Sequence, residues 1–471
     1  MSDAILLKLR YTVARAKRVV CARRLMCGAI ATLAASVMIN IGCQTVKTTV
    51  NDTIDAITPG PSGPGEVDRI RKEPDIRVRI ARQSQGHTLA GPERFLVRSA
   101  SSAGSAAQPV TLKGPVAVSS SAKGVTTISG DGVRREWGFG VDIEVHAGDG
   151  AGGTGHAPES IRMDERLLPG YLTLRPLWSE NADRMDIIVT MPIESYLPGV
   201  LAKELPKAWP RQTFAAQAVA SRTYALQERS RARATGKLID VEDTTADQVF
   251  GGTGSHVEGV EAVRATRGWV LSERGDLIRA YFSSQCGGRS ASAKTAWTSK
   301  TPPPFNTVES LQGGERVAYC QRAPQYRWTL TRKSDEINKR LRAWGRGKGS
   351  DLANITKLRR IEVAERNEAG RPTQYTIVSD NEREYTVAPE ELREACNWPV
   401  QGLAPITREN RVSSGDIEVT VVATDVRFVG RGFGHGVGMC QWCAKGMGDA
   451  GKDWRSMVED FYPGVEVKKL Y

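Results

Sequence analysis

The sequence lacks two features that would fix its architecture at once. It contains no internal repeat, and its expected strands and helices do not alternate regularly. The first absence excludes repeat architectures, and the second argues against a doubly wound parallel sheet. What is present is the composition of a folded protein: 471 residues, 40% hydrophobic and 25% charged, enough for one large domain or two to three ordinary ones.

Most of the chain also lacks a strong positive charge. The formal net charge is +12, but residues 1–24 hold seven Lys or Arg and one Asp, a net of +6, so the remainder carries only +6. A charge of that size over more than 400 residues favours weak attraction to an anionic surface. It argues against a nucleic-acid-binding protein.

Residues 25–42 carry no charge at all and follow the basic N-terminus directly. This order predicts an export signal over residues 1–43. Because Gly42-Cys43 resembles the end of a bacterial lipoprotein cleavage box, we expect a signal of lipoprotein type with Cys43 as the lipidated N-terminus. The alternative is a single uncleaved membrane anchor, although an apolar run of roughly 17 residues is at the short limit for spanning a bilayer.

Polar and then Pro/Gly-rich residues 44–72 predict a flexible tether. From there on, short alternating apolar runs such as "IRVRI" and "VDIEVHA" predict a β-rich region over 73–185. The apolar spacing of 214–234 predicts a long helix, and shorter helices are expected near 334–344 and 388–396. The predicted class is α+β: mainly antiparallel β-rich domains packed around a central helical segment.

One segment, "MPIESYLPGVLAKELPKAWPRQTFAAQAVASRTYAL" over 191–226, closely resembles the stage II sporulation protein D family, whose other branch is the amidase-enhancer (LytB) proteins. The matching positions are Pro192, Glu194, Tyr196, Leu197, Gly199, Val200, Glu204, Pro206, Gln217, Ala218, Arg222, Thr223 and Tyr224. The resemblance recurs at "YFSSQCGGRSASAKTAW" (281–297), "CQRAPQYRW" (320–328) and "GRGFGHGVGMCQW" (430–442).

The resemblance implies a catalytic core over 186–300, a β-rich inserted region over 301–429, and a C-terminal segment over 430–471 that completes the core. It also implies lytic transglycosylase activity, which cleaves the β-1,4 bond between N-acetylmuramic acid and N-acetylglucosamine in peptidoglycan. The catalytic glutamate of the family maps onto Glu204. The residues implied to bind substrate or to support the catalytic group are Glu194, Gln217, Arg222, Tyr224, Ser283, Ser284, His435 and Gln441.

A single carboxyl group is sufficient for this reaction. Ordinary glycosidases need two carboxyl groups, because water or an enzyme nucleophile must be activated as well. A transglycosylase uses the C6 hydroxyl of the sugar, so one group acts first as acid and then as base. Such a group needs a raised pKa, and Val200, Leu201, Leu205 and Trp209 are near enough in sequence to bury Glu204. Local sequence alone would instead favour an exposed glutamate at a helix end.

Glu194 is the competing carboxylate. On one continuous helix, Glu194 and Glu204 would lie roughly 80° apart, and Pro198 argues against such a helix. We expect Glu194 to be a structural or supporting carboxylate. Arg222 is suited to bind the lactyl carboxylate of muramic acid, or alternatively to form a salt bridge inside the fold.

The glycines around His435 let backbone approach a ligand closely, and His435 itself is a candidate to bind a sugar hydroxyl. Some members of the family bind zinc through Cys and His shortly after the long helix. Here that segment, "GKLIDVEDTTADQVFGG", has neither residue, so we expect no metal and no cofactor.

Five cysteines remain outside the predicted signal. In an oxidising compartment they tend to pair. We expect a Cys286–Cys320 disulfide and a local Cys440–Cys443 disulfide, with a redox pair or half a zinc site as the alternatives for the latter.

The predicted protein is therefore an exported, lipid-anchored lytic transglycosylase of the cell envelope. Its expected partners are peptidoglycan strands, the membrane, and, in one alternative, a cell-wall amidase that a non-catalytic protein would stimulate. Nucleic acid is not among them. A structural envelope lipoprotein is the third possibility.

Overall fold

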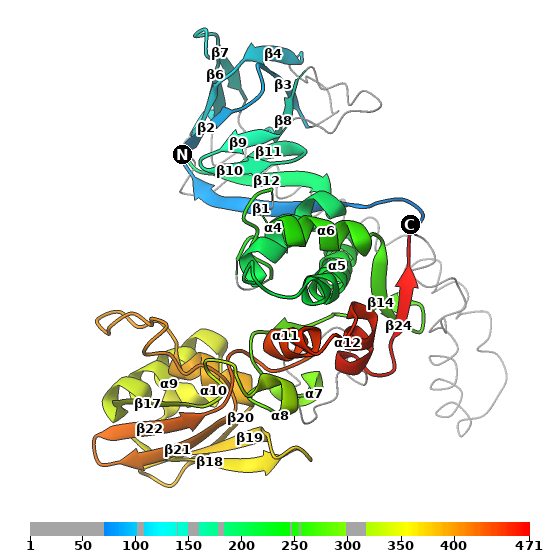
Figure 1. Ribbon diagram of the computed structural model, residues 1–471. Coiled ribbons are helices and arrows are strands. Elements are labelled where there is room, and N and C mark those ends of the chain that lie inside the picture. Colours follow the sequence, from blue (N-terminus) through cyan, green and yellow to red (C-terminus); the bar gives the residue numbers. More distant parts are fainter. Residues whose placement is uncertain are drawn as a thin grey trace, which may run out of the picture. The chain divides into compact units, whose positions relative to one another are not determined.

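The computed structural model describes residues 70–100, 108–138, 140–148, 160–177, 183–244, 247–253, 256–297 and 317–471 (Figure 1). The predicted signal with Cys43, and the tether up to residue 69, lie outside these ranges. No helix within them has both the length and the apolar character needed to cross a membrane.

The strands are β1 (Asp75–Ser84), β2 (Gly86–Ala90), β3 (Arg94–Ser99), β4 (Val110–Lys113), β5 (Val116–Ser121), β6 (Gly124–Ile128), β7 (Arg134–Trp137), β8 (Ile143–Ala147), β9 (Ile161–Met163), β10 (Arg166–Leu168), β11 (Tyr171–Pro176), β12 (Met185–Pro192), β13 (Val241–Glu242), β14 (Trp269–Glu273), β15 (Asp276–Leu277), β16 (Phe282–Ser283), β17 (Trp328–Lys333), β18 (Leu358–Arg366), β19 (Pro372–Ser379), β20 (Glu384–Val387), β21 (Ile417–Val422), β22 (Asp425–Gly430), β23 (Met439–Cys440) and β24 (Glu466–Lys469). The helices are α4 (Ile193–Glu204), α5 (Arg211–Ala234), α6 (Val257–Ala265), α7 (Ala293–Ala296), α8 (Val317–Cys320), α9 (Ser334–Lys348), η1 (Asp351–Asn354), α10 (Pro389–Cys396), α11 (Gln441–Asp449) and α12 (Trp454–Phe461).

Two larger sheets form the N-terminal part. One has the order β13-β1-β12-β11-β8-β3-β4 and the other the order β10-β9-β2-β5-β6-β7. Neighbouring strands are antiparallel except for the short β1–β13 pair. β12 is buried along nearly its whole length, as expected for a strand covered on both faces. The α+β class predicted from the sequence is confirmed.

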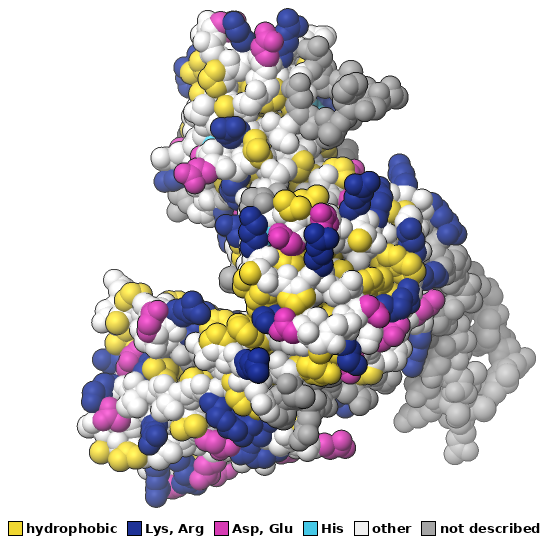
Figure 2. Space-filling view, in the orientation of Figure 1, with side chains coloured by type: hydrophobic (Ala, Val, Ile, Leu, Met, Phe, Trp, Pro, Cys, Tyr) yellow, Lys and Arg dark blue, Asp and Glu magenta, His cyan; other side chains and the backbone are white. Residues whose placement is uncertain are grey.

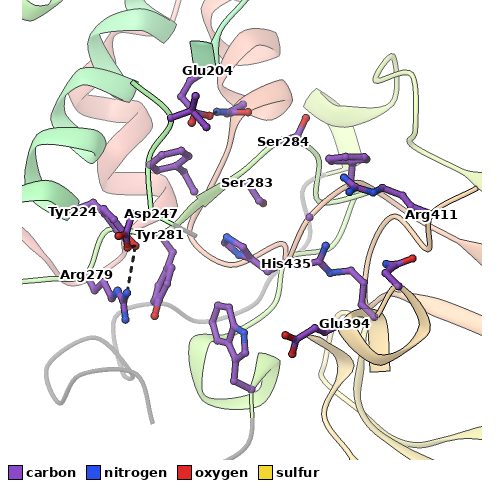
Figure 3. A pocket seen from close by; sticks show the side chains of 18 of the residues that line it. Glu204, Tyr224, Asp247, Arg279, Tyr281, Ser283, Ser284, Glu394, Arg411 and His435 are labelled. Atoms are coloured by element: carbon purple, nitrogen blue, oxygen red, sulfur yellow. Dashed lines mark hydrogen bonds between the residues drawn. The ribbon is translucent and has the colours of Figure 1, made fainter. Parts of the chain in front are cut away.

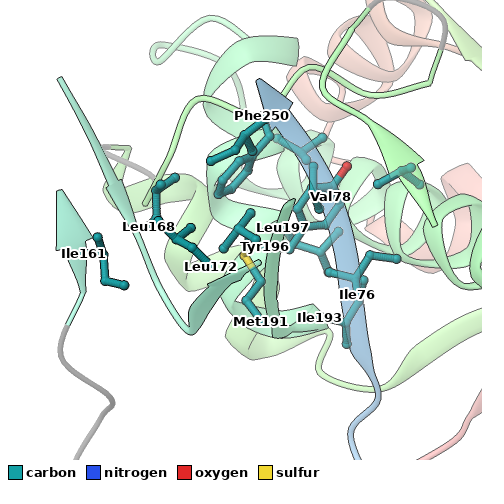
Figure 4. Close-up of a cluster of buried hydrophobic side chains, with 14 of the residues drawn as sticks. Ile76, Val78, Ile161, Leu168, Leu172, Met191, Ile193, Tyr196, Leu197 and Phe250 are labelled. Atoms are coloured by element: carbon teal, nitrogen blue, oxygen red, sulfur yellow. The ribbon is translucent and has the colours of Figure 1, made fainter. Parts of the chain in front are cut away.

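A continuous apolar core joins the larger sheet to α4 (Figure 4). The alternating residues Ile76 and Val78 of β1 are fully buried. They belong to the same cluster as Met191 of β12 and as Tyr196 and Leu197 of α4. This burial fixes the face that α4 presents to the sheet.

The predicted long helix is confirmed as α5, which runs from Arg211 to Ala234. One side of it belongs to the core of Figure 4, while Ala216, Val219 and Ala220 belong to a second core with α11 and α12. A helix buried on both sides tolerates only small residues where its neighbours approach closely, which explains the alanines of 215–220.

The segment from β17 to β22 has a core of its own. It contains the sheets β17-β22-β21 and β18-β19-β20, and Leu341 of α9, Tyr375 of β19 and Phe428 of β22 meet in one apolar cluster. The two short helices expected from the sequence appear as α9 and α10.

Charged side chains of both signs are interspersed over the face in Figure 2. Lys and Arg are accompanied by Asp and Glu on this face. Such a mixed surface fits the modest charge that the chain carries beyond its N-terminus.

The structure corrects one expectation about α4. The helix is continuous through Pro198, although the sequence argued against this. Proline in a helix removes one backbone hydrogen bond, and the burial of five of its apolar side chains outweighs that loss. Glu194 lies in the first turn and Glu204 is the last residue, so they stand about 15 Å apart along the axis and occupy different surroundings.

A buried ion pair fixes the beginning of α4 against α5. Arg222 Nε donates to Glu194 Oε1 at 2.9 Å and its Nη2 donates to Oε2 at 2.7 Å. The Arg222 side chain is fully buried and that of Glu194 is 9% exposed. The Glu194 carboxylate also accepts from the backbone N–H of Gly268 at 3.2 Å and from the Tyr471 hydroxyl at 2.7 Å. One carboxylate thus ties α4, α5, the start of β14 and the C-terminus together.

We expect Arg222→Ala to lower the free energy of unfolding by about 3–5 kcal/mol, because it leaves a buried carboxylate without its cation. The matched control is Arg211→Ala. Arg211 pairs with Glu261 at 3.2 Å, but these side chains are 76% and 48% exposed, so the expected loss is only about 0–1 kcal/mol. Denaturant unfolding of the two variants measures both losses, and equal losses would contradict the role given to the buried pair.

Candidate active site

A cleft of about 1070 Å³ lies between α4, the β16 region and α10 (Figure 3). Six of the residues predicted from the sequence line it: Glu204, Tyr224, Ser283, Ser284, His435 and Gln441. Its other walls contain Asp247, Val249, Arg279, Tyr281, Phe282, Trp297, Arg393, Glu394, Asn397, Trp398, Pro399, Arg411, Phe433 and Gly434.

Glu204 reaches the cleft from the C-terminal end of α4. It is partly exposed, while Val200, Leu201, Leu205 and Trp209 are buried as expected. Burial raises the pKa of the Glu204 carboxyl, and a hydrogen bond from Gln441 acts in the opposite direction. The negative end of the helix dipole also disfavours a charged carboxylate at this position.

Lys203 does not face this carboxyl group. Its side chain is exposed and lies along Gly251, where an added Cβ would meet Lys203 Cε at 2.6 Å. A lysine facing Glu204 would lower the pKa of its carboxyl group, but the ammonium group of Lys203 points away from Glu204.

Gln441, the first residue of α11, bridges two parts of the site. Its Nε2 donates to Glu204 Oε2 at 3.0 Å and to Gln217 Oε1 at 3.4 Å. Gln217 is fully buried and donates to Ser221 Oγ at 3.0 Å. Gln217 therefore helps to hold the side chain of Gln441 in place, and it does not line the cleft itself.

Tyr224 and Arg279 form one wall with Asp247. The Tyr224 hydroxyl donates to Asp247 Oδ1 at 3.2 Å, and Arg279 Nη2 donates to the same hydroxyl at 3.3 Å. Arg279 also pairs with the buried Glu228 at 2.7 Å and lies 5.2 Å from the centre of the Tyr281 ring. These contacts make this wall rigid and give it both aromatic and polar character.

Ser283 is the last residue of β16, which pairs with β23 in parallel, and Ser284 follows it directly. The Ser284 carbonyl accepts from the backbone N–H of Trp442 at 3.1 Å. Ser283 Oγ is buried and, within the described ranges, has no hydrogen-bond partner. A buried hydroxyl without a partner at a cleft is available to a ligand.

His435 is held inside the glycine-rich loop. Its Nδ1 accepts from the backbone N–H of Val437 at 3.0 Å, and its ring lies against Tyr281 and Trp297, with ring centres 5.7 and 5.4 Å away. Burial lowers the pKa of His435 to about 4. It is therefore neutral at neutral pH and suited to hydrogen bonding rather than to charge.

The glycines of this loop serve packing more than ligand contact. Gly432 and Gly438 have φ of 76° and 68°. An added Cβ would lie 2.3 Å from the Gln285 carbonyl oxygen at the first and 2.1 Å from the Tyr281 carbonyl oxygen at the second. Only glycine permits this conformation so near another backbone.

Three predicted residues do not line the cleft: Gln217, described above, and the pair of Glu194 and Arg222. Arg222 and Glu194 are bound to each other, so Arg222 forms the internal salt bridge that was the alternative to carboxylate binding. The arginines that do line the cleft are Arg279, Arg393 and Arg411.

The inserted region supplies a wall of the cleft that the sequence did not predict. Glu394, Trp398 and Arg411 come from this region, outside the one motif quoted from it, residues 320–328. The only available signal was a helix expected near 388–396. By contrast, Tyr281 and Trp297 are the ends of the family-like segment 281–297, although neither was among the predicted site residues.

The five described cysteines are free thiols in the structure. Neither expected bridge, Cys286–Cys320 or Cys440–Cys443, is formed. The Sγ atoms of these four cysteines all lie within 4.8 Å of one another, so the geometry does not divide them into the two expected pairs.

Comparison with known proteins identifies two regions. Residues 181–272 match the stage II sporulation protein family, and residues 306–438 match a domain of unknown function. The first match contains Glu204, and the second contains most of the predicted inserted region together with Arg411 and His435.

Three relatives illustrate the similarity. An uncharacterized protein of Brachyspira hyodysenteriae is 30% identical over 290 residues, which are 60% of this chain and 69% of that protein. The amidase enhancer of Bacillus subtilis is 27% identical over 57% of this chain, and only 40% of that protein is covered. Stage II sporulation protein D of Bacillus subtilis is 25% identical over 60% of this chain and 76% of that protein. This chain therefore belongs to the cell-wall-related family of stage II sporulation protein D and the amidase enhancer.

Proposed function

We propose that the protein is a peptidoglycan lytic transglycosylase of the cell envelope, anchored through its N-terminus, with Glu204 as the single general acid and base. The observation that carries the proposal is the position of Glu204: a carboxyl group of raised pKa in the wall of a large cleft. A general acid must be protonated before the reaction, and burial is the usual means of achieving this near neutral pH.

The other two carboxylates of the cleft are bound to protein partners. Asp247 accepts from the Tyr224 hydroxyl and from the backbone N–H of Glu242 at 2.9 Å. Glu394 accepts from Trp344 Nε1 at 3.0 Å and pairs with Lys348 at 2.9 Å. Neither is placed as a free acid, which supports a mechanism with one catalytic carboxyl group.

The chemistry then proceeds through Glu204 alone. The protonated carboxyl donates its proton to the glycosidic oxygen as the C1–O bond breaks, and the resulting carboxylate accepts the proton of the C6 hydroxyl. The C6 oxygen bonds to C1 and closes a 1,6-anhydro ring, and Glu204 is again protonated. No water is consumed, so no second group is needed to activate one.

The cleft has the character of a sugar site. Aromatic rings line it together with many polar and charged side chains, several of which are held in place by hydrogen bonds to the protein. Tyr281, Trp297 and Trp398 offer flat apolar faces to sugar rings, while Ser283 Oγ is available for a sugar hydroxyl. Its volume, about 1070 Å³, exceeds that of a typical small-molecule site of about 300–1,000 Å³, which fits a polymer segment.

Stimulation of a cell-wall amidase is the second candidate function, favoured by the similarity to the amidase enhancer. A protein that only binds the wall has no need of a carboxyl group with a raised pKa in its cleft. This function becomes the better account if the wild-type protein leaves glycan intact and accelerates an amidase.

We expect Glu204→Gln to reduce cleavage of amidase-treated glycan strands by at least about 10²–10⁴-fold, the usual contribution of general acid–base catalysis, while glycan binding persists. Glutamine keeps the shape of the side chain but cannot transfer a proton. The matched variant Glu194→Gln should impair folding more than chemistry, because Glu194 holds the buried Arg222. A Glu204→Gln protein that cuts at nearly the wild-type rate would refute the acid–base role.

The pH dependence gives an independent test. If protonated Glu204 is the acid, kcat/KM falls as the pH rises through its raised pKa. Gln441→Leu removes the hydrogen bond that stabilises the carboxylate, so this alkaline limb should move to higher pH. Lys203→Gln is the control, since Lys203 faces away from the carboxyl group, and it should leave the limb in place. The account is contradicted if the pH at which kcat/KM falls changes in Lys203→Gln and is unchanged in Gln441→Leu.

A further inference from the structure

Four buried cysteines from separate parts of the chain converge on one point. Cys286 follows β16, Cys320 ends α8, Cys440 ends β23, and Cys443 lies in the first turn of α11. Each is at most 1% exposed, and the four Sγ atoms all lie within 4.8 Å of one another. Cys320 and Cys440 are 120 positions apart in the sequence, and Cys286 and Cys443 are 157 positions apart. The fold therefore brings these pairs together, and the local sequence does not.

The spacing of the sulfur atoms fits a single metal ion. Four thiolates at about 2.3 Å from a tetrahedral zinc ion stand about 3.8 Å from one another. Here Cys286 Sγ lies 3.6 Å from Cys443 Sγ, and Cys320 Sγ lies 4.0 Å from Cys440 Sγ. A disulfide would require about 2.05 Å. The sulfurs of a multinuclear cluster bind different metal atoms and would be spread more widely.

Backbone donors already point at one of the sulfur atoms. The N–H groups of Cys286 and Cys443 lie 3.3 and 3.4 Å from Cys440 Sγ. Cys440 is also the residue that caps the N-terminus of α11, where the helix dipole favours a thiolate. Hydrogen bonds of this kind orient and stabilise the ligands of metal sites.

A buried cation lies close to the cluster. Arg371, which is 1% exposed, donates to the carbonyl of Cys286 at 3.3 Å and to that of His435 at 3.0 Å. Four thiolates around a divalent ion carry a net negative charge, and a nearby guanidinium reduces the cost of burying it.

We propose that Cys286, Cys320, Cys440 and Cys443 form a closed, structural Cys₄ site for one zinc ion. Four sulfur ligands leave no open coordination position, as in structural rather than catalytic zinc sites. The site differs from the zinc site of some family members, which would lie in the segment after α5. Cys440 and Cys443 of the Cys-x-x-Cys supply two of the four ligands, and the fold brings Cys286 and Cys320 to them.

The site would hold the cleft in shape. Gln441, which hydrogen-bonds Glu204, stands between two of the ligands in the sequence. Ser283 and Ser284 of the cleft lie three and two positions before Cys286. A bound ion would therefore join the two segments that face Glu204, and it would do so whether or not the protein cleaves glycan.

The test is the metal content of the full chain, purified without chelator or reductant, together with its thiol status. We expect about one zinc per chain, released when a mercurial reagent blocks the thiols. Cobalt replacement should give the sulfur-to-cobalt charge-transfer absorption and the strong visible bands of tetrahedral thiolate coordination. Both measurements use the wild-type protein, so they stand even if cysteine variants fail to fold.

Cys443→Ser should lose most of the bound metal and unfold at lower temperature. The matched control is Cys396→Ser, because Cys396 is equally buried but belongs to a different core, and it should retain the full metal content. A metal-free protein in which non-reducing peptide mapping finds these four cysteines in disulfides, or in which the free thiols bind no added zinc, would overturn the proposal. Iron in place of zinc would keep the four-thiolate site and overturn the choice of metal.

Discussion

The buried pair of Glu194 and Arg222 is the constraint on which the rest of the site depends. It fixes the first turn of α4 to the middle of α5, and through Gly268 and Tyr471 it holds β14 and the C-terminus as well. A helix is stiff, so fixing its beginning and burying one of its faces also fixes its end. Glu204 is that end. The two glutamates are thus parts of one device: the first is charged and fully paired, and it positions the second, whose burial favours the neutral form.

The opposite side of Glu204 is built by residues more than 200 positions away. Gln441 donates to the carboxyl group from the start of α11, and the glycine-rich loop before it fits closely against the 281–287 segment. The hydrogen bond from Gln441 favours the carboxylate while burial favours the acid. Burial is the larger of the two influences, so the pKa of Glu204 is raised, as the acid step requires. The Gln441 hydrogen bond stabilises the carboxylate that acts as the base in the next step.

Periodic patterns predicted the fold class, the long helix α5 and the short helices α9 and α10, since each depends on the residues of one segment. The resemblance located Glu204 and five of the other residues that line the cleft. It could not show that Arg222 forms a salt bridge with Glu194, because the spacing of residues in a sequence does not say which buried charges pair. Nor could it show the wall with Glu394 and Trp398, which belongs to the inserted region. The continuity of α4 through Pro198 depends on burial, which outweighs local propensity. The four-cysteine cluster has no recognisable spacing, because only tertiary structure brings Cys286 and Cys320 to the Cys-x-x-Cys.

The central claim is that Glu204 works alone because the sugar supplies its own nucleophile. Cleavage of amidase-treated glycan strands in heavy-oxygen water, followed by mass measurement of the products, tests this most directly. The account predicts that the new muramic acid ends contain no heavy oxygen and are lighter than hydrolysed ends by one water. Incorporation of one heavy oxygen at each new end would show that water is the nucleophile, and the single-carboxyl mechanism would then be wrong.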